Sequence, residues 1–435
     1  MEKVVIVGGG LAGVRTVEAL RRAGFDGELS IVGAERHLPY DRPPLSKAVL
    51  MGESDDTTLD VDLDELRCRP VLDCRATALR LADDPGGGGA LATTAGELTF
   101  DGLVLATGAT PVALPGTGPR PAGDVGDVGG SAGSGGSGGA VRTHLLRTID
   151  DARALRAALR PERRVAIVGA GWIGAEVATA AAKAGCRVTV VEAADVPLAA
   201  AMGAEIGALT APWYAEAGVE LLLGRKVAAV EVGGLALADG GFIDADDVLV
   251  CVGVRPETGW LSGSGLVVDN GVVVDESLRA AVTGTGDGTG DRAAATRPDV
   301  VAVGDCAAWW STRYGRRLRI EHWDTALSAP PVAAATLMGR PAAYDPVPYF
   351  WSEQFGRMVQ YAGWHQGAER LVTRGDPAGH KWAVCWLTGD RLDAVLTVDR
   401  PRDLVQARRI MAADGRVDPE LLADPEISVR NAAPS

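Results

Sequence analysis

The stretch from residue 4 to residue 13 reads VVIVGGGLAG, an apolar run that leads directly into a G-x-G-x-x-G pattern. This order is typical of a buried strand, a tight turn and a helix. In such a turn Gly8 permits the sharp bend, Gly10 lets a pyrophosphate approach the backbone, and Gly13 lets the helix pack closely on the strand. The helix N-terminus then presents N–H groups and a positive dipole end to phosphate. The segment therefore predicts a dinucleotide-binding unit.

A carboxylate stands where this unit needs one. The next apolar run, residues 29–32, leads through Gly33 and Ala34 to Glu35. An acid at the end of the second strand accepts hydrogen bonds from ribose hydroxyls. Because strand, turn, helix and acid occur together, a dinucleotide site explains the segment better than a plain glycine turn.

The stretch from residue 165 to residue 174 reads VAIVGAGWIG and repeats the pattern. Its second expected strand, residues 187–191, ends on Glu192. A carboxylate there bonds a ribose 2′-hydroxyl and repels a 2′-phosphate, and residues 193–195 offer no arginine to hold that phosphate. This favours NADH over NADPH. Two such sites imply two dinucleotides. The simplest pair is a nicotinamide dinucleotide that donates a hydride and a flavin that accepts it, because the flavin can then release electrons singly or in pairs.

The rest of the chain alternates short β-rich runs with alanine-rich stretches, which is typical of parallel sheets. We expect strands at residues 3–7, 29–32, 101–106, 165–168, 187–191, 247–252 and 300–303. We expect helices at residues 11–23, 150–160, 172–185 and 203–217. After about residue 335 aromatic residues and β-like alternation increase, and a final helix is expected at residues 401–413. This part is predicted to be a separate α+β domain.

Composition excludes several classes of protein. The net charge of −14 and the isoelectric point near 4.9 disfavour binding to nucleic acid. We find no apolar stretch long enough to cross a bilayer and no export signal, so we expect no membrane contact and a cytoplasmic location. The six cysteines form no C-x-x-C pair and are expected to be reduced, buried thiols. The oligomeric state is left open.

Three glycine-rich segments are expected to be mobile surface loops, because they carry too little apolar area to offset the entropy of ordering. They are residues 84–89, 123–139 and 283–296.

Residues 38–47 read LPYDRPPLSK, and this segment resembles a hallmark of the FAD-dependent ferredoxin reductases. These flavoproteins serve bacterial oxygenases and rubredoxins within the pyridine nucleotide–disulfide oxidoreductase superfamily. Further segments that resemble the family are ATGATP at 106–111, VGVRP at 252–256, AVGDCA at 302–307, RIEHW at 319–323 and YFWSEQ at 349–354. The resemblance covers nearly the whole chain. The pair Pro330 and Pro331, where the family has a polar helix, must start or break a helix.

The resemblance implies roles for five side chains. Lys47 would lie near the flavin N5 and pair with Glu176, which would orient the nicotinamide amide. Asp305 would hold the ribityl chain, and Arg42 would contact the pyrophosphate or the ring edge. Trp323 would lie beside the isoalloxazine. The alternatives are a surface lysine, a helix-surface carboxylate for Glu176, a helix N-cap for Asp305 and a core tryptophan for Trp323.

The expected site is therefore shared between two cofactors, with Lys47, Glu176 and Trp323 as candidate catalytic residues. The expected FAD contacts are Gly8, Gly10, Leu11, Ala12, Gly13, Glu35, Arg42, Lys47, Ala106, Thr107, Gly108, Asp305 and Trp323. The expected NAD contacts are Gly169, Gly171, Ile173, Gly174, Glu176, Glu192 and Gly253. No metal site is expected.

The predicted fold class is α/β, with two Rossmann-like dinucleotide-binding domains and a C-terminal α+β domain. The FAD domain is expected to comprise residues 1–112 and 245–330. Residues 113–244 would form the NAD domain, and residues 331–435 the C-terminal domain.

The absence of a cysteine near the expected flavin site bears on how electrons leave the flavin. Related enzymes that reduce disulfides or peroxide need a cysteine near the flavin, but residues 40–50 hold Ser46 and no cysteine. The resemblance and this absence favour a reductase that passes electrons from NADH through FAD to a ferredoxin-type iron–sulfur protein serving an oxygenase. The alternatives are a cysteine-free NADH oxidase or quinone reductase, and a flavoprotein whose response to NADH serves partner binding.

A cluster of four arginines is the candidate docking patch for an acidic carrier. Its members are Arg313, Arg316, Arg317 and Arg319. The alternative is that they pair with neighbouring carboxylates.

Overall fold

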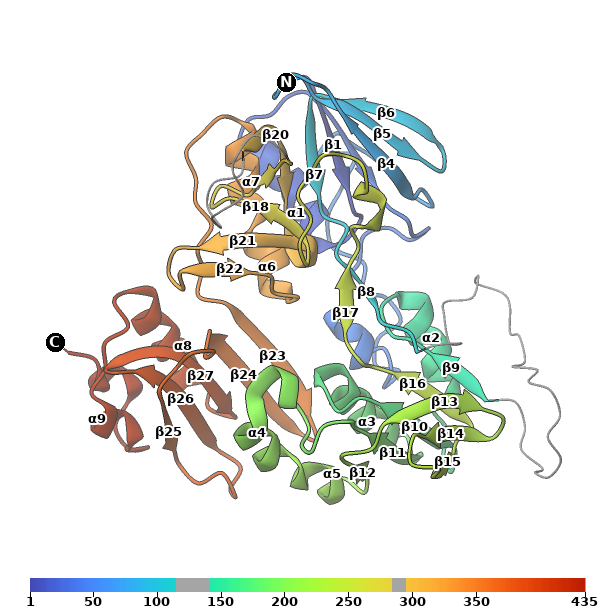
Figure 1. The fold of residues 1–435 in the computed structure, drawn as a ribbon, viewed down its shortest axis with the longest axis vertical. Helices are drawn as coiled ribbons and strands as arrows, with labels where there is room; N and C mark the ends of the chain where they lie inside the picture. The colour runs from blue at the N-terminus through green and yellow to red at the C-terminus, as the bar shows by residue number, and fades with distance from the viewer. Residues whose placement is uncertain (115–140, 284–294, 435) are drawn as a thin grey trace.

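Two parallel sheets, each built on one glycine fingerprint, form the two larger parts of the molecule (Figure 1). The computed structural model describes residues 1–114, 141–283 and 295–434. A third part, the C-terminal antiparallel sheet, lies beside the second parallel sheet and below the first in Figure 1. The central strands of both sheets are mostly apolar and buried, because both faces of each sheet are covered.

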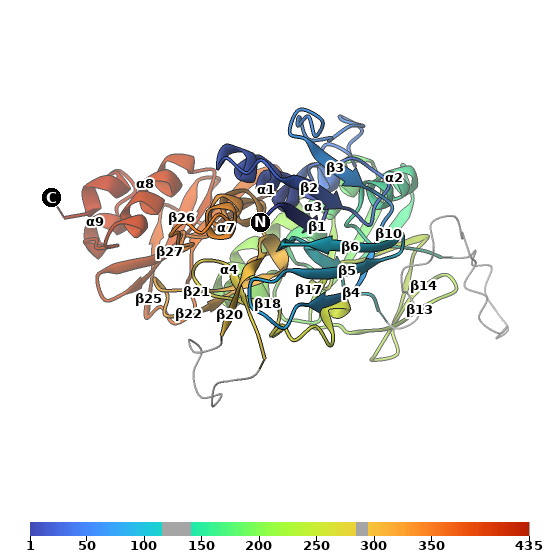
Figure 2. The same cartoon turned by 90° about the horizontal axis from the view of Figure 1, so that it is seen from above.

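The first sheet has nine strands. In spatial order they are β22 (Arg316–Leu318), β21 (Ala307–Ser311), β18 (Val272–Val274), β19 (Arg279–Ala281), β20 (Thr296–Ala302), β7 (Gly102–Leu105), β1 (Lys3–Val7), β2 (Glu28–Val32) and β3 (Cys68–Val71). The last five run parallel. Helices α1 (Leu11–Arg22) and α7 (Pro330–Leu337) cover one face, and a small sheet of β4 (Ala76–Leu81), β5 (Gly89–Thr93) and β6 (Gly96–Phe100) covers the other (Figures 1 and 2).

The second parallel sheet has five strands. In spatial order they are β12 (Glu220–Leu222), β11 (Arg187–Val191), β10 (Arg164–Val168), β16 (Asp247–Val250) and β9 (Arg142–His144). Its helices are α2 (Ile149–Ala158), α3 (Trp172–Lys183), α4 (Ala199–Thr210) and α5 (Pro212–Glu216). A small antiparallel sheet of β13 (Val227–Glu231), β14 (Gly234–Leu237) and β15 (Phe242–Asp244) packs beside it. The strands β8 (Ala109–Pro111) and β17 (Val254–Pro256) pair where the chain passes between the two parallel sheets.

The C-terminal part is an antiparallel sheet of five strands covered by a helix. In spatial order the strands are β23 (Tyr349–Gln354), β24 (Arg357–Gly363), β27 (Arg391–Val398), β26 (Trp382–Thr388) and β25 (Arg370–Arg374). Its helices are α8 (Pro401–Ala412) and α9 (Pro419–Ala423). The predicted fold class, with two Rossmann-like units and a C-terminal α+β unit, is confirmed, while the boundaries of the domains stay a prediction.

Prolines divide two of the helical segments. Residues 203–217, expected as one helix, form α4 and α5, because Pro212 cannot continue α4 and instead begins α5. The helix α4 also begins earlier than expected, at Ala199, and is kinked at Gly203. The expected break at Pro330 is present: α6 (Trp323–Ser328) ends there and α7 begins.

The first glycine-rich segment is not a free loop throughout. Gly88 and Gly89 are packed into the turn that begins β5, so the prediction of a mobile loop is wrong there. The Gly88 N–H donates to the buried Asp299 carboxylate at 2.9 Å, and Arg297, which is itself paired with Asp299 at 2.7 Å, donates to Ala82 O. The second glycine-rich segment and most of the third lie outside the described residues.

Among the residues that the structure describes, no helix combines the length and apolar character needed to cross a membrane.

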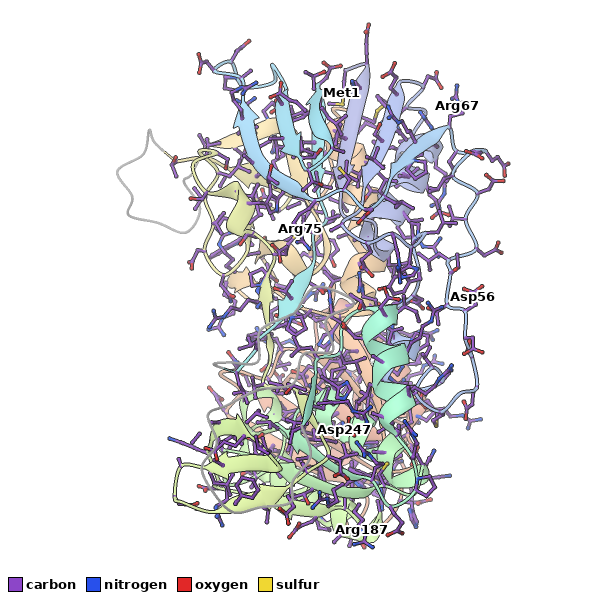
Figure 3. All side chains as sticks on the ribbon, turned by 90° about the vertical axis from the view of Figure 1, so that its right-hand side faces the viewer. Met1, Asp56, Arg67, Arg75, Arg187 and Asp247 are labelled. Atoms are coloured by element: carbon purple, nitrogen blue, oxygen red, sulfur yellow. The ribbon has the colours of Figure 1, made fainter. Side chains whose placement is uncertain are left out.

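A buried carboxylate fixes the edge of the second sheet. Asp247, at the start of β16, has a side chain 0% exposed and lies in the lower part of Figure 3. It accepts hydrogen bonds from Arg142 at 2.9 Å, His144 at 2.9 Å and Arg163 at 2.7 Å. Burial favours the neutral carboxyl, but the hydrogen bonds from His144, Arg142 and Arg163 outweigh burial and hold the pKa of Asp247 well below its usual range. Asp247 therefore joins β16 to β9 and to the start of β10.

We expect Asp247→Asn to lower the free energy of unfolding at pH 7 by about 2–3 kcal/mol, because it removes the charge that two arginines and a histidine surround. Since the native pKa is depressed, this stabilisation is complete above the unfolded-state value of about 3.9 and is lost as the pH falls towards the native value. The stability gap between the wild type and the variant should therefore narrow below about pH 4. Urea unfolding at several pH values measures it.

Asp244→Asn is the matched control, because Asp244 is 71% exposed and, among the described residues, pairs with Arg164 alone, at 3.7 Å. If the difference in unfolding free energy between the wild type and Asp247→Asn stayed constant down to about pH 3, the charge of Asp247 would not stabilise the fold.

Candidate active site

One cavity of about 540 Å³ brings the two fingerprints together. Its wall includes the turns that follow β1 and β7 in the first sheet, the first turn of α3 in the second, and two aromatic residues of β23. Ligand sites of doubly wound folds lie at this place, outside the carboxyl ends of parallel strands. Of the expected FAD contacts, those that line the cavity are Gly8, Gly10, Leu11, Ala12, Glu35, Arg42, Lys47, Ala106, Thr107, Gly108, Asp305 and Trp323. Of the expected NAD contacts, those that line it are Gly171, Ile173, Glu176 and Gly253.

The remaining candidates do not line this cavity. A side chain at Gly13 would meet the Gly8 carbonyl oxygen at 2.1 Å, and one at Gly174 would meet the Gly169 carbonyl oxygen at 2.1 Å. These glycines therefore allow each helix to cross its strand closely. Glu192 accepts from the Ala170 N–H at 2.8 Å and so braces the second turn from outside the cavity.

Both helix N-termini are open towards the cavity. A side chain at Gly10 or at Gly171 would meet no atom within 4 Å, and neither α1 nor α3 has a side-chain cap. Uncapped N–H groups at a helix start, with free space in front of them, suit the phosphates of a dinucleotide. The residues present therefore fit one dinucleotide at each helix.

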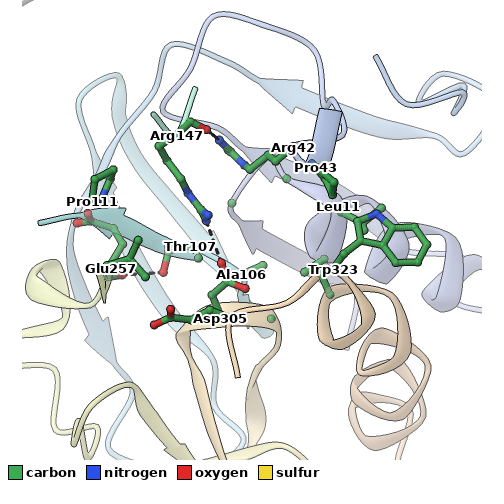
Figure 4. Close-up of a pocket in the computed structure, with 18 of the residues that line it drawn as sticks. Leu11, Arg42, Pro43, Ala106, Thr107, Pro111, Arg147, Glu257, Asp305 and Trp323 are labelled. Atoms are coloured by element: carbon green, nitrogen blue, oxygen red, sulfur yellow. Dashed lines mark hydrogen bonds and ion pairs between the residues drawn. The ribbon is translucent and has the colours of Figure 1, made fainter. Parts of the chain in front are cut away.

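Glu35 and Arg42 contact each other at the first site. Arg42 donates to Glu35 at 2.8 Å and to the Arg147 carbonyl oxygen at 2.6 Å, and Tyr40 also donates to Glu35 at 2.5 Å. The carboxylate expected to bind a ribose is thus oriented by two donors on the next loop. Arg42 lines the same wall, and Figure 4 shows it pointing towards Arg147.

Arg147 is a cavity residue that no sequence pattern singled out. It lies between β9 and α2, where its carbonyl oxygen accepts from Arg42 and its guanidinium donates to the Asp305 carboxylate at 2.9 Å (Figure 4). A side chain at Gly108 would meet the Arg147 guanidinium at 2.9 Å, so this arginine also touches the turn after β7. The only signal in the sequence was a basic residue just before the capped helix that begins at Ile149.

Lys47 and Glu176 form an ion pair where the two units meet. The Lys47 ammonium donates to Glu176 Oε2 at 2.8 Å, and the two side chains are 15% and 3% exposed. The Ser46 hydroxyl donates to the same oxygen at 2.5 Å. Glu176 is therefore not a helix-surface carboxylate, and Lys47 is not a surface lysine.

Aromatic side chains form another part of the cavity wall. Trp323 lines the cavity, donates from Nε1 to Asp41 at 2.9 Å and meets Trp351 edge to face at 5.7 Å between ring centroids. His322 stacks on Phe350 with centroids 4.2 Å apart. Burial lowers the pKa of His322 to about 4, although the Asp305 carboxylate acts in the opposite direction, so the ring is neutral at neutral pH.

The cysteines are not equipped for a thiol relay. All six are free, and of the two that line the cavity, Cys74 is buried. Burial, with a smaller effect of the Glu176 carboxylate, raises the pKa of the Cys251 thiol to about 12. Burial also raises the pKa of Cys306. Reactive cysteines need the thiolate, so these two thiols are unsuited to nucleophilic chemistry at neutral pH.

The four arginines near residue 316 do not form a single patch. Successive residues of β22 point to opposite faces, which separates Arg316 from Arg317. Arg313 donates to Met411 O at 2.5 Å, Arg317 donates to Val274 O at 2.9 Å, and Arg319 pairs with Glu321. The four arginines therefore do not form one continuous cationic surface, and the docking of an acidic carrier at this place stays a prediction.

The comparisons with known proteins agree with this geometry. Residues 2–329 match the family model described as pyridine nucleotide-disulphide oxidoreductase, and residues 349–433 match the model described as reductase C-terminal. The chain is 37% identical to the ferredoxin–NAD(+) reductase component of the anthranilate 1,2-dioxygenase system of Burkholderia cepacia, with 98% of each chain covered.

Two solved structures are similar over almost the whole chain. The crystal structure of Fdr9 has 43% identity and a TM-score of 0.84, with 100% of both chains covered. The covalent putidaredoxin reductase–putidaredoxin complex has 31% identity and a TM-score of 0.85, with 99% of this chain and 97% of the other covered. The predicted resemblance to ferredoxin reductases is confirmed, and the chain belongs to the pyridine nucleotide-disulphide oxidoreductase family.

Proposed function

We propose that this chain carries electrons from NADH, through FAD, to a ferredoxin-type iron–sulfur protein that serves an oxygenase. Membership of the family implies FAD and a nicotinamide dinucleotide as cofactors. The relative from Burkholderia cepacia is named as a ferredoxin–NAD(+) reductase component, and the putidaredoxin reductase structure contains its redox partner. The observation that carries the proposal is the single cavity lined by both fingerprints, with the Lys47–Glu176 pair where they meet.

FAD bound at the first fingerprint would supply the chemistry, since a flavin accepts a hydride and releases electrons one at a time. The α1 N-terminus would hold its pyrophosphate, and Glu35 its ribose. Arg147 and Asp305 lie where they would hold the polar chain between the ring and the phosphates. Residues 1–112 and 245–330 would thus form the FAD domain, residues 113–244 the NAD domain, and residues 331–435 the third domain.

The residues between the two sites would align the nicotinamide. The Lys47 ammonium lies against Glu176, which holds it in one place, so that it can stabilise negative charge nearby. The Glu176 carboxylate would accept from the nicotinamide amide and so fix the direction in which the ring faces. Ile173 is 42% exposed at the cavity wall, an apolar surface that a bound ring would cover. Trp323 and Trp351 would keep water from the part of the cavity that they line.

We expect the purified protein to be yellow, to release about one FAD per chain on denaturation, and to reduce cytochrome c with NADH faster when a ferredoxin is added. Visible spectroscopy and a cytochrome c assay with a panel of bacterial ferredoxins measure this. A colourless protein that takes up no FAD would contradict the proposal. Fast reduction of oxygen or quinone, unchanged by any ferredoxin, would instead support an NADH oxidase or quinone reductase. Association of the protein on addition of NADH, without turnover, would support the partner-binding alternative.

We expect Lys47→Ala and Glu176→Gln each to slow the bleaching of the flavin absorbance by NADH by about 10- to 100-fold, because each breaks the ion pair that aligns the reacting groups. The FAD content should stay near that of the wild type, since neither side chain belongs to the phosphate or ribose contacts. Stopped-flow absorbance measures the rate.

Lys183→Ala, at the far end of the same helix α3, is the control for the loss of a positive charge. Wild-type rates in both Lys47→Ala and Glu176→Gln would show that the pair is only structural.

We expect Glu192→Gln to lower the ratio of kcat/KM for NADH to that for NADPH by about tenfold, because it removes the charge that repels a 2′-phosphate. Glutamine keeps an oxygen that can accept from the Ala170 N–H, so the turn itself should persist. Adding Ala194→Arg should lower the ratio further. Steady-state kinetics with both dinucleotides measures it, and a wild-type protein that already prefers NADPH would refute the assignment.

A further inference from the structure

The Glu176 carboxylate accepts hydrogen bonds from two separate parts of the chain. Its Oε2 atom accepts from Ser46 at 2.5 Å and from Lys47 at 2.8 Å, both on the loop that follows the first sheet's second strand. Its Oε1 atom accepts from the Ser352 hydroxyl at 2.6 Å. Ser352 belongs to β23 of the C-terminal sheet, 176 positions along the chain from Glu176. The third domain therefore reaches the ion pair directly.

A second residue of β23 fixes the direction of the serine hydroxyl. The Gln354 amide donates to Ser352 Oγ at 3.1 Å, and both side chains are 1% exposed. A serine hydroxyl has one proton to donate. Because the amide occupies an acceptor site of the hydroxyl, the hydroxyl proton is left for Glu176. The order of donation is therefore Gln354 to Ser352 to Glu176.

The tip of the hairpin between β23 and β24 anchors this arrangement on α3. The Phe355 N–H donates to Thr179 Oγ1 at 2.9 Å, and the Phe355 ring packs on Tyr214 with centroids 4.7 Å apart. Phe355 has a φ of +50°, an unfavourable conformation for an aromatic residue. Its contacts with the second unit offset that cost. The register of β23, and with it the place of Ser352, is thus set by docking on the helix that carries Glu176.

The pattern of acceptors leaves one direction open. A carboxylate offers about four acceptor positions, of which Ser46, Lys47 and Ser352 occupy three. The remaining position is on Oε1, the oxygen that Ser352 holds, and no donor from the described part of the chain occupies it. Glu176 lines the cavity, whereas Ser352 is not among the cavity-lining residues. Ser352 therefore lies behind the carboxylate and would not itself touch a ligand.

We propose that Ser352 is a positioning residue, which turns the Glu176 carboxylate so that the free acceptor position on Oε1 meets the carboxamide N–H of the nicotinamide. This inference rests on the proposed function. It gives the C-terminal domain a part in nicotinamide recognition that neither fingerprint contains. Without the serine hydroxyl, Lys47 and Ser46 would still hold Oε2, but Oε1 would lose the donor that fixes its direction.

The test compares two dinucleotides in the FAD-loaded protein. NAD⁺ has a carboxamide N–H, whereas 3-acetylpyridine adenine dinucleotide has a methyl group in its place. We expect Ser352→Ala to weaken equilibrium binding of NAD⁺ about 5- to 10-fold and to leave binding of the acetylpyridine analogue unchanged, because only the first donates to Glu176. Quenching of tryptophan fluorescence measures both constants. The limiting rate of flavin bleaching by NADH should fall about tenfold in the same variant.

Two variants separate positioning from packing. Ser352→Thr keeps the hydroxyl and should restore discrimination between the two dinucleotides at least in part. Thr397→Val removes another buried hydroxyl from the same sheet, one with no hydrogen-bond partner among the described residues, and should behave as the wild type. Equal weakening of both dinucleotides by Ser352→Ala would overturn the proposal, since it would indicate a general loss of structure.

A double-mutant cycle completes the test. If Ser352 acts through Glu176, Ser352→Ala should have no further effect on NAD⁺ binding in a Glu176→Ala background. The same loss in both backgrounds would overturn the proposal. A wild-type protein that binds no FAD or is not reduced by NADH would instead refute the proposed function. If Ser352→Ala distinguished NAD⁺ from the acetylpyridine analogue as well as the wild type does, and its flavin were reduced by NADH at the normal rate, only the role of Ser352 would be refuted.

Discussion

The fold depends on a close crossing of backbone over backbone that occurs twice. At Gly13 and at Gly174, the first turn of a helix lies so near the preceding strand that a side chain would meet a carbonyl oxygen at 2.1 Å. The crossing aims the N-terminus of each helix at the space beyond the carboxyl ends of the strands, where uncapped N–H groups attract phosphate. One steric requirement thus places both dinucleotide sites, and the chain connections at β8 and β17 turn them towards a shared cavity.

Glu176 ties the three parts of the molecule together at that cavity. A carboxylate 3% exposed is costly unless a positive charge and several donors surround it. Here the donors come from the first unit through Ser46 and Lys47, and from the C-terminal sheet through Ser352. Displacement of any one part would leave a buried charge with too few hydrogen bonds. The requirement to satisfy Glu176 therefore favours a single arrangement of the three parts.

The sequence alone predicted the structural features that depend on short, local patterns of residues. The strands and helices around both fingerprints, and the break at Pro330, follow from periodicity and from proline and glycine chemistry. Contacts between distant segments could not be predicted in this way. Arg147 reaches Asp305 across 158 positions, and Gly88 is held by Asp299 across 211. The sequence also could not show that the four arginines lack a shared face, because adjacent residues of a strand, such as Arg316 and Arg317, point to opposite sides.

The C-terminal sheet shows why a composition change is weaker evidence than a motif. Its aromatic content predicted a separate domain. That prediction describes the sheet by itself, but it says nothing of where the sheet lies against the active site. That position comes from one hairpin, whose tip places Phe355 on Tyr214 and whose first strand sends Ser352 to Glu176 and Trp351 to Trp323. Trp351 lines the cavity together with Phe350, while the next residue, Ser352, supports the carboxylate and is not among the cavity-lining residues. A strand is therefore suited to this task, since two adjacent residues can shield the site and orient its charged group at once.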